Sequence, residues 1–250
     1  MMQKRKSNVY QSGSIAPFSV SRSKIDLFID CPRCFYFDRK LGISRPSMPG
    51  WPINSAVDQL LKNEFDLLRE KGEAHELMKV YGINAVPFSH PQLSVWRDDN
   101  HRWIGATFLH EPTNLTIHGI VDDIWQDRET KELYIVDYKA TSTSRAISLD
   151  DEYKAGYKRQ IEIYQWIFRK LGFKVSDVGY FVFANAGKNR DKFDGRLDFE
   201  VSIIPYKGND SWIEKTIVAI KKCLDADTIP SAGDGCEHCG FVELARKEVG

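Results

Sequence analysis

The stretch HGIVDDIWQDRETKELYIVDYKAT, residues 118–141, decides how this sequence is expected to fold. Two strand-like runs, residues 116–126 and 132–140, flank the polar sequence DRETK, which is typical of a β-hairpin. Because side chains on a strand alternate between two faces, Asp137 and Lys139 point the same way. Asp122 lies across the hairpin from them, so the sequence predicts two carboxylates and one amine that converge on one face.

Both carboxylates follow apolar residues, Ile-Val at 120–121 and Ile-Val at 135–136. An unpaired charge buried in such a strand costs several kcal/mol, so partners are expected. Two converging carboxylates can hold Mg²⁺, and a neighbouring lysine can orient or deprotonate the water that attacks a phosphodiester. The alternative is a hairpin with a solvated polar face, since D-x-K alone is a weak pattern.

The remaining sequence predicts a mixed α/β fold around this hairpin. Hydrophobic periodicity and turn signals predict helices over residues 21–28, 54–70, 157–171 and 212–224, and strands over 178–184 and 197–204. We therefore expect a single α/β domain with a mixed central β-sheet flanked by helices. Residues 1–18 are expected to form a flexible basic arm, and residues 19–250 the folded domain.

Composition limits the class of protein. The 250 residues are 42% apolar, 12% aromatic and 28% charged, as in a soluble globular protein rather than a disordered one. The net charge of zero argues against a protein that coats nucleic acid, although residues 1–45 carry nine basic side chains and three acidic ones. No run approaches the roughly 18 apolar residues that span a membrane, and no apolar segment follows the basic N-terminus. A cytoplasmic location is expected.

Three motifs in order, GIVDD, VDYK and QIEIY, resemble the PD-(D/E)XK nuclease superfamily. The closest likeness is to its RecB-like exonuclease branch, which includes CRISPR-associated and phage nucleases. The resemblance implies a restriction-endonuclease-like core and a divalent-metal-dependent deoxyribonuclease. It assigns the catalytic site to five residues. Asp122 and Asp137 hold the metal, Lys139 assists catalysis, and Gln160 and Tyr164 come from a helix. A packed helix with an incidental glutamine is the alternative for the last two.

The resemblance leaves a further metal ligand open. Relatives in this branch usually place a histidine on the helix before the hairpin, and the corresponding position here holds Asp58. An aspartate suits Mg²⁺ as a ligand. However, Ser55 and Asp58 also have the S-x-x-D spacing of a helix capping box, so both interpretations stay open. Glu64, on the inward side of the same predicted helix, is the reserve candidate.

Four of the five cysteines form two C-x-x-C pairs, Cys31 with Cys34 and Cys236 with Cys239. Four thiolates fit Zn²⁺ or an iron–sulfur cluster, and a site without metal also remains open. The resembling family often carries a [4Fe–4S] cluster that joins the chain ends, with one cysteine near the N-terminus and three near the C-terminus. Here the place of the last cysteine is taken by Ala245 and Cys34 is extra, so the identity of the metal is left open.

The sequence thus predicts a Mg²⁺- or Mn²⁺-dependent DNA exonuclease that acts on single strands or DNA ends. We expect it to act in repair, recombination or CRISPR-type processing. Protein partners from those systems and an oligomer are both compatible with the sequence, and no membrane association is expected. Basic side chains expected to bind phosphates are Arg33, Arg39, Lys154, Lys158 and Arg159. The alternatives are a catalytically inactive nucleic-acid-binding module and an accessory subunit that is active only in a complex.

Overall fold

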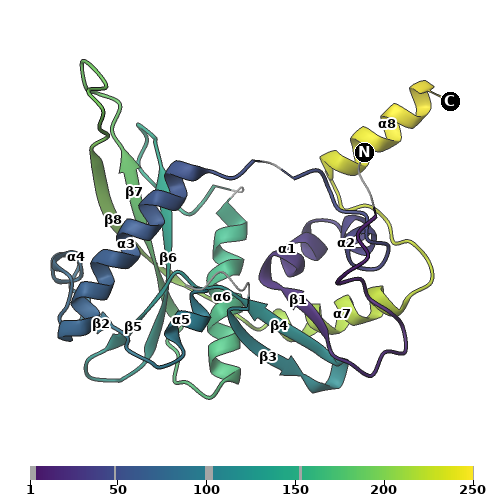
Figure 1. Cartoon of the computed structure of the whole chain (residues 1–250), viewed down its shortest axis with the longest axis horizontal. Coiled ribbons are helices and arrows are strands. Elements are labelled where there is room, and N and C mark those ends of the chain that lie inside the picture. The colour runs from purple at the N-terminus through teal and green to yellow at the C-terminus, as the bar shows by residue number, and fades with distance from the viewer. Residues whose placement is uncertain (1–3, 48, 99–103, 152–153, 250) are drawn as a thin grey trace. The chain divides into compact units, whose positions relative to one another are not determined.

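A computed structural model describes residues 4–47, 49–98, 104–151 and 154–249, and Figure 1 traces their elements. The chain forms two compact units. One contains Met1–Pro49, Thr107–His118 and Ser211–Gly250, and the other contains Gly50–Ala106 and Gly119–Asp210. We call them the terminal unit and the central unit. Helices and mixed sheet confirm the expected α/β class.

The central unit is built on a five-stranded sheet with the order β2-β5-β6-β7-β8. Its strands are β2 (Ala85–Pro87), β5 (Asp123–Asp127), β6 (Leu133–Thr141), β7 (Val178–Ala186) and β8 (Phe199–Lys207). The β5–β6 hairpin is antiparallel, as the sequence predicts, with Asp123 opposite Val136. Strands β6 and β7 are parallel and are joined through helix α6 (Ala155–Lys170), because parallel neighbours need a crossover connection. The sheet is therefore mixed.

Helix α3 (Pro52–Lys71) lies against β2 and β6 (Figure 1). Phe65 of this helix stacks on Trp125 at a ring-centroid distance of 5.3 Å, in a core that includes Val136 and Tyr138. The odd-numbered residue Lys139 instead lies over the ring of Tyr157 on α6. Alternation along β6 therefore directs Tyr138 toward α3 and Lys139 toward α6.

The terminal unit carries a three-stranded sheet with the order β1-β4-β3, in which β1 and β4 are parallel. Its elements are β1 (Phe18–Ser21), α1 (Arg22–Asp30), α2 (Pro32–Arg39), β3 (Ala106–His110), η1 (Glu111–Thr113), β4 (Leu115–Gly119), α7 (Ile213–Asp225) and α8 (Glu237–Val249). Helix α1 packs against α2 and α7. This arrangement brings the two ends of the described chain into one unit.

One strand prediction is wrong. The continuous strand expected over residues 116–126 is divided into β4 and β5, which belong to different sheets. Residues 120–122 lie between the two strands. The apolar run does not reveal this break, because Ile117, Val121 and Ile124 are all fully buried whichever sheet they serve. Asp122 consequently lies just before β5 rather than inside a strand.

The short elements of residues 72–115, for which the sequence offers no motif, are α4 (Glu76–Val80), β2, α5 (Leu93–Trp96), β3 and η1. Residues 4–17 contain no helix or strand. The amide of Arg5 donates to the Gly42 carbonyl at 2.9 Å, and that of Tyr10 to the Arg39 carbonyl at 2.7 Å. The boundary between arm and domain stays a prediction, and residues 1–3 lie outside the described part. No helix among the described residues is both long and apolar enough to span a lipid bilayer.

Candidate active site and cysteine metal site

The first candidate site lies in the central unit, on the β5–β6 hairpin. Asp137 is in the middle of β6 and is 1% exposed. Asp122 directly precedes β5, and its Oδ2 accepts a hydrogen bond of 2.8 Å from the backbone amide of Tyr138. This bond ties one carboxylate to the neighbouring strand, between Asp137 and Lys139. The hairpin therefore places two carboxylates and the lysine together, as the sequence predicts.

The Asp137 carboxylate is short of partners. Within the described part of the chain, neither of its buried oxygens accepts a hydrogen bond, although the Lys139 ammonium contacts Oδ2. Burial, reinforced by the negative charge of Asp122, raises the pKa of Asp137 to about 7, and Lys139 opposes this shift. Two carboxylates that repel each other at one buried place are typical of a site for a cation.

Lys139 is held between charge and an aromatic ring. Burial disfavours its ammonium form, but the carboxylates of Asp137 and Asp122 outweigh burial and raise the pKa of Lys139. The ammonium nitrogen lies 4.8 Å from the centroid of the Tyr157 ring. Lys139 is therefore a positive charge fixed beside the two aspartates.

Asp58 of α3 faces the same acidic group. Burial and the carboxylate of Asp122 together raise the pKa of Asp58, while Lys62 opposes the shift through an ion pair of 2.9 Å. The capping-box alternative is wrong, because the helix begins earlier. Its N-cap is Trp51, and the hydroxyl of Ser55 donates to the Trp51 carbonyl at 3.3 Å.

The reserve candidate Glu64 is engaged elsewhere. Its carboxylate lies 2.9 Å from the Nε2 atom of His75, and its side chain is 58% exposed. Nothing in these contacts connects Glu64 with Asp122 or Asp137.

The donor set fits a hard divalent cation such as Mg²⁺ or Mn²⁺, which prefers carboxylate oxygens. The carboxylate of Asp137 and the neighbouring carboxylates of Asp122 and Asp58 provide such donors. They are gathered less tightly than a closed metal site. Among described residues, the four cysteines are the one group of three or more His, Cys, Asp or Glu side chains whose ligand atoms all lie within 4.8 Å of one another. Lysines pair with Asp58 and Asp137 in this structure.

Helix α6 contributes Gln160 and Tyr164, which are one helical turn apart and 7% and 3% exposed. Tyr164 packs directly on the backbone of Gly119. A Cβ atom at position 119 would lie 2.3 Å from Cε1 of the tyrosine, so this contact requires glycine. The glycine of the GIVDD motif and the tyrosine of the QIEIY motif are thus two halves of one contact, which the sequence analysis missed.

A second buried acid, Asp123, forms a network that the sequence analysis also missed. Its Oδ2 accepts a hydrogen bond of 2.7 Å from the Tyr138 hydroxyl, and Arg69 of α3 forms an ion pair with Oδ1. Burial raises the pKa of Asp123 against the opposing charge of Arg69. Since Asp123 is fully buried, a charged or hydrogen-bonding partner is expected, but the sequence does not indicate that this partner is Arg69.

The expected phosphate-binding residues differ in availability. Arg39 is 2% exposed, and its guanidinium donates to Asn8 Oδ1 at 2.8 Å and to the Ser19 carbonyl at 2.6 Å. These contacts support a structural role rather than a phosphate contact. Arg33 pairs with Glu243 at 2.5 Å in the terminal unit. In the central unit, Lys154, Lys158 and Arg159 lie at or near the first turn of α6.

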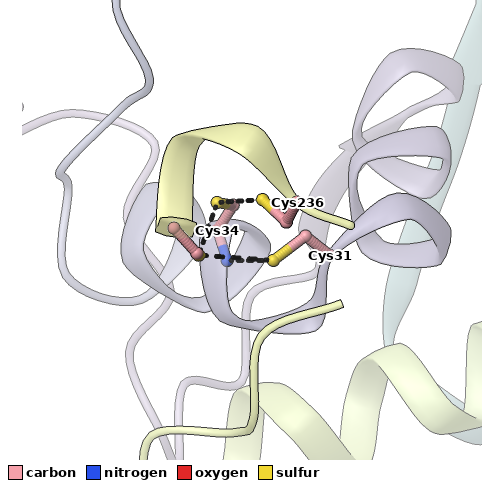
Figure 2. Close-up of side chains that lie close together, drawn as sticks. Cys31, Cys34 and Cys236 are labelled. Atoms are coloured by element: carbon pink, nitrogen blue, oxygen red, sulfur yellow. Dashed lines mark hydrogen bonds between the residues drawn. The ribbon is translucent and has the colours of Figure 1, made fainter. Parts of the chain in front are cut away.

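The second candidate site is the cysteine group in the terminal unit. The Sγ atoms of Cys34 and Cys236 are 3.7 Å apart, and Figure 2 shows them next to Cys31. Cys239 lies 3.7 Å from Cys31 and 3.6 Å from Cys34. All four are free thiols, so the predicted two-plus-two group is confirmed as a cluster that could hold a metal. The fifth cysteine, Cys223, is half-buried and outside this cluster.

Donors around two of the sulfurs favour thiolates, whereas burial raises the pKa of Cys34 and Cys239. The guanidinium of Arg45 donates to Cys236 Sγ at 3.3 Å, and the amide of Gly233 donates to Cys31 Sγ at 3.3 Å. Burial opposes ionisation, but the amides of Gly233 and Cys34 outweigh it and lower the pKa of Cys31 to about 6. Thiolates are the form that binds metal, so the surroundings fit a metal site.

Of the comparisons with known proteins, one assigns the chain to a family. The family model of the PD-(D/E)XK nuclease superfamily matches residues 53–244. The chain is also similar to a solved structure titled "Crystal structure of SSO0001", with 15% identity, 97% of this chain and 90% of that chain covered, and a TM-score of 0.41. No curated protein sequence matches it. Because the family model spans more than half of the residues, the chain belongs to the PD-(D/E)XK nuclease superfamily.

Proposed function

We propose that this protein is a divalent-metal-dependent DNA exonuclease of the RecB-like branch, acting on single strands or DNA ends. Membership of the nuclease superfamily supports cleavage of nucleic acid. The observation that carries the proposal is the buried carboxylate of Asp137, which lies beside the Asp122 carboxylate and whose partner among the described residues is the Lys139 ammonium. A buried acid next to a second carboxylate costs stability, so a function that needs it explains why it is there.

In the proposed site, Asp122 and Asp137 hold Mg²⁺ or Mn²⁺, with Asp58 as a further ligand. The cation, when bound, supplies Lewis-acid chemistry at the scissile phosphate. Lys139 places a positive charge next to both aspartates, where it orients the attacking water and offsets the negative charge that develops on the phosphate. The hydrogen bond from the Tyr138 amide keeps Asp122 oriented.

Helix α6 is proposed to shape the substrate side of the site. Tyr164, seated on Gly119, fixes this helix next to the segment that leads into β5, and Gln160 lies one turn away on the same face. Lys154, Lys158 and Arg159 are proposed to contact DNA phosphates, together with Arg33. Contacts of this kind release counterions, so binding should weaken steeply as salt increases.

The four cysteines are proposed to bind Zn²⁺ or a [4Fe–4S] cluster. Sulfur–sulfur distances of 3.6–3.7 Å match a single ion more closely. A tetrahedral site with Zn–S bonds of about 2.3 Å places its sulfurs about 3.8 Å apart. A four-iron cluster binds each thiolate to a different iron and spreads the sulfurs further. Zinc is therefore the metal that we favour.

The expected setting is cytoplasmic processing of DNA ends in repair, recombination or CRISPR-type reactions. A reducing compartment would keep the four free thiols available for metal. A partner protein or an oligomer remains compatible with this proposal.

The test is digestion of end-labelled single- and double-stranded DNA with Mg²⁺, Mn²⁺ or EDTA, alongside an RNA of the same sequence. We expect cleavage of DNA that requires metal and is lost in Lys139→Ala. Lys131→Ala is the matched control, because Lys131 lies in the exposed turn of the same hairpin. The order in which products appear gives the polarity of digestion.

Three outcomes would contradict the proposal. Cleavage by Lys139→Ala at the wild-type rate would remove the assigned site. Binding of DNA without cleavage, in a folded protein that retains its cysteine metal, would favour an inactive binding module. Cleavage that appears only when a copurifying protein is added back would favour the accessory subunit.

The cysteine site is tested by metal analysis of the purified protein and of Cys31→Ser. We expect about one zinc per chain in the wild type, less in the variant, and a lower melting temperature. Joining residues about 200 positions apart stabilises a fold by about 4–5 kcal/mol if the disulfide estimate applies to a metal. Cys223→Ser, outside the cluster, is the control. Iron in the purified protein, with the absorption band of an iron–sulfur cluster, would change the assigned metal from zinc to a cluster. Unchanged metal content and melting temperature in Cys31→Ser would refute the site.

A further inference from the structure

A pocket of about 350 Å³ opens beside Lys139, between the end of β6, the loop that follows it and the start of α6. Its lining includes Lys139, Arg145 and Lys154, with Asp151 as its one acidic residue. Tyr157 and Phe183 provide aromatic surface, and hydroxyl groups of the loop provide polar surface. Three cations against one acid, next to aromatic rings, are the features of a site for an organic anion.

Residues 143 and 145–148, which line the pocket, are held in place. The side chain of Asn185 on β7 accepts a hydrogen bond of 2.9 Å from the Thr143 amide and donates one of 3.1 Å to the Thr143 carbonyl. The hydroxyl of Thr143 then accepts from the amide of Arg145 at 3.1 Å. At the other end, the ammonium of Lys154 donates to the Ser148 carbonyl at 2.5 Å. The pocket is therefore a formed feature of the fold.

The three cations differ in whether an acidic side chain already pairs with them. Lys139 contacts Asp137, and Lys154 pairs with Asp151 at 2.8 Å. Arg145 is exposed, and in the part of the chain that the structure describes its guanidinium has no acidic partner within 4 Å. A planar guanidinium is suited to bidentate binding of phosphate. Arg145 is therefore the side chain best placed to take a ligand's charge.

We propose that this pocket binds one nucleotide unit of the cut strand, with its phosphate on Arg145 and Lys139 and its base toward Tyr157 and Phe183. The inference rests on the proposed nuclease function and adds to it the place of the nucleotide next to the scissile phosphodiester. Lys139 belongs to both sites, so a nucleotide held here is adjacent to Asp137. The volume is at the lower end of the roughly 300–1,000 Å³ of small-molecule sites, which suits one nucleotide rather than several.

The test measures binding without cleavage. The full chain in EDTA is titrated by calorimetry with thymidine 5′-monophosphate, thymidine and inorganic phosphate. Separate portions of the same protein preparations, without EDTA, are assayed for DNA cleavage with metal. We expect the monophosphate to bind more tightly than either part alone. Arg145→Ala should weaken this binding roughly tenfold or more, as expected for the loss of a charge-assisted hydrogen bond.

Two further variants distinguish the effect of the pocket's shape on binding from the effect of positive charge. Ala146→Phe leaves every cation in place but fills the pocket from an exposed lining position, and should also weaken binding. Arg128→Ala removes an equal charge from the exposed β5–β6 turn of the same unit and should leave binding unchanged.

The proposal is overturned if a folded wild type does not bind the monophosphate, if inorganic phosphate binds equally well, or if neither pocket variant changes the affinity. A protein that cleaves DNA but does not bind the monophosphate refutes the pocket alone. A protein that binds the monophosphate through Arg145 but cleaves nothing keeps the pocket and refutes the proposed nuclease function.

Discussion

The carboxylates on the two faces of the β5–β6 hairpin differ in how many hydrogen bonds they accept. On one face, Asp123 is fully buried and is satisfied by the Tyr138 hydroxyl, the Arg69 guanidinium and its own following amide. On the other, Asp137 is equally buried, but within the described part of the chain its oxygens accept no hydrogen bond. Asp122, beside Asp123 in sequence, belongs to the second face through its bond from the Tyr138 amide.

The difference teaches how a structural acid is told from a functional one. A folded protein satisfies nearly every buried polar group, so a satisfied carboxylate such as Asp123 needs no explanation beyond the fold. An unsatisfied one such as Asp137 indicates a ligand or a reaction. The two acids lie on different strands, but adjacent residues of β6 serve both purposes because its side chains alternate between α3 and α6: Tyr138 donates to Asp123, and Asp137 lies on the opposite face.

The largest effect is expected for Asp137→Asn, which should lower DNA cleavage by about 1,000-fold or more, since metal binding contributes several kcal/mol to catalysis. The same variant should be about 1–2 kcal/mol more stable than wild type in EDTA, because it removes the repulsion between the Asp137 and Asp122 carboxylates while Lys139 keeps Asp122 as a neighbouring charge. Chemical denaturation in EDTA and the end-label assay measure the two effects. Lower stability of the variant would show that Asp137 is a structural acid after all.

Asp123→Asn should have the opposite profile. It removes the buried partner of Arg69, which retains Asp66 and the Phe88 carbonyl. The cost is therefore expected to be about 2–4 kcal/mol, toward the lower part of the range for broken buried pairs. Urea unfolding measures it, with Glu70→Gln at an exposed position of α3 as the control. A variant that is as stable as wild type but inactive would move Asp123 into the catalytic group.

The smallest effect is expected for Tyr138→Phe. This change removes the hydroxyl that donates to Asp123 but keeps the ring against Phe65 and the backbone amide that donates to Asp122. Loss of a hydrogen bond to a charged group costs about 1.5–3 kcal/mol of stability. The cleavage rate measured below the melting transition should stay near that of wild type. A selective loss of cleavage would mean that the two faces are coupled through Tyr138.

Much of the central unit follows from local patterns. The β5–β6 hairpin, helix α3, helix α6 and strand β7 lie within a few residues of their predicted positions, because strong periodicity and clear turn residues determine them. Short elements such as β2 and α5 carry too few residues for a periodic signal. The break at residues 120–122 escaped detection because both flanking strands are buried and read as one apolar run.

The chemistry of the site follows the same division. The order of the acidic and lysine motifs was sufficient to nominate Asp122, Asp137 and Lys139 for one face, and the two C-x-x-C pairs were sufficient to nominate a metal group. Their roles remain proposals, but their proximity is now seen. In contrast, the sequence overestimated Arg39, whose charge is used inside the terminal unit.

By itself, the sequence determined the class of fold, the strand that carries Asp137 and the thiol groups, because alternation and spacing are properties of neighbouring residues. Only the tertiary structure decided that Asp123 is satisfied and Asp137 is not, that Tyr164 rests on Gly119, and that Arg145 lines a pocket beside Lys139. Each of these depends on which distant side chains meet, and hydrogen bonding, packing and charge act over a few ångströms of space whatever the separation along the chain.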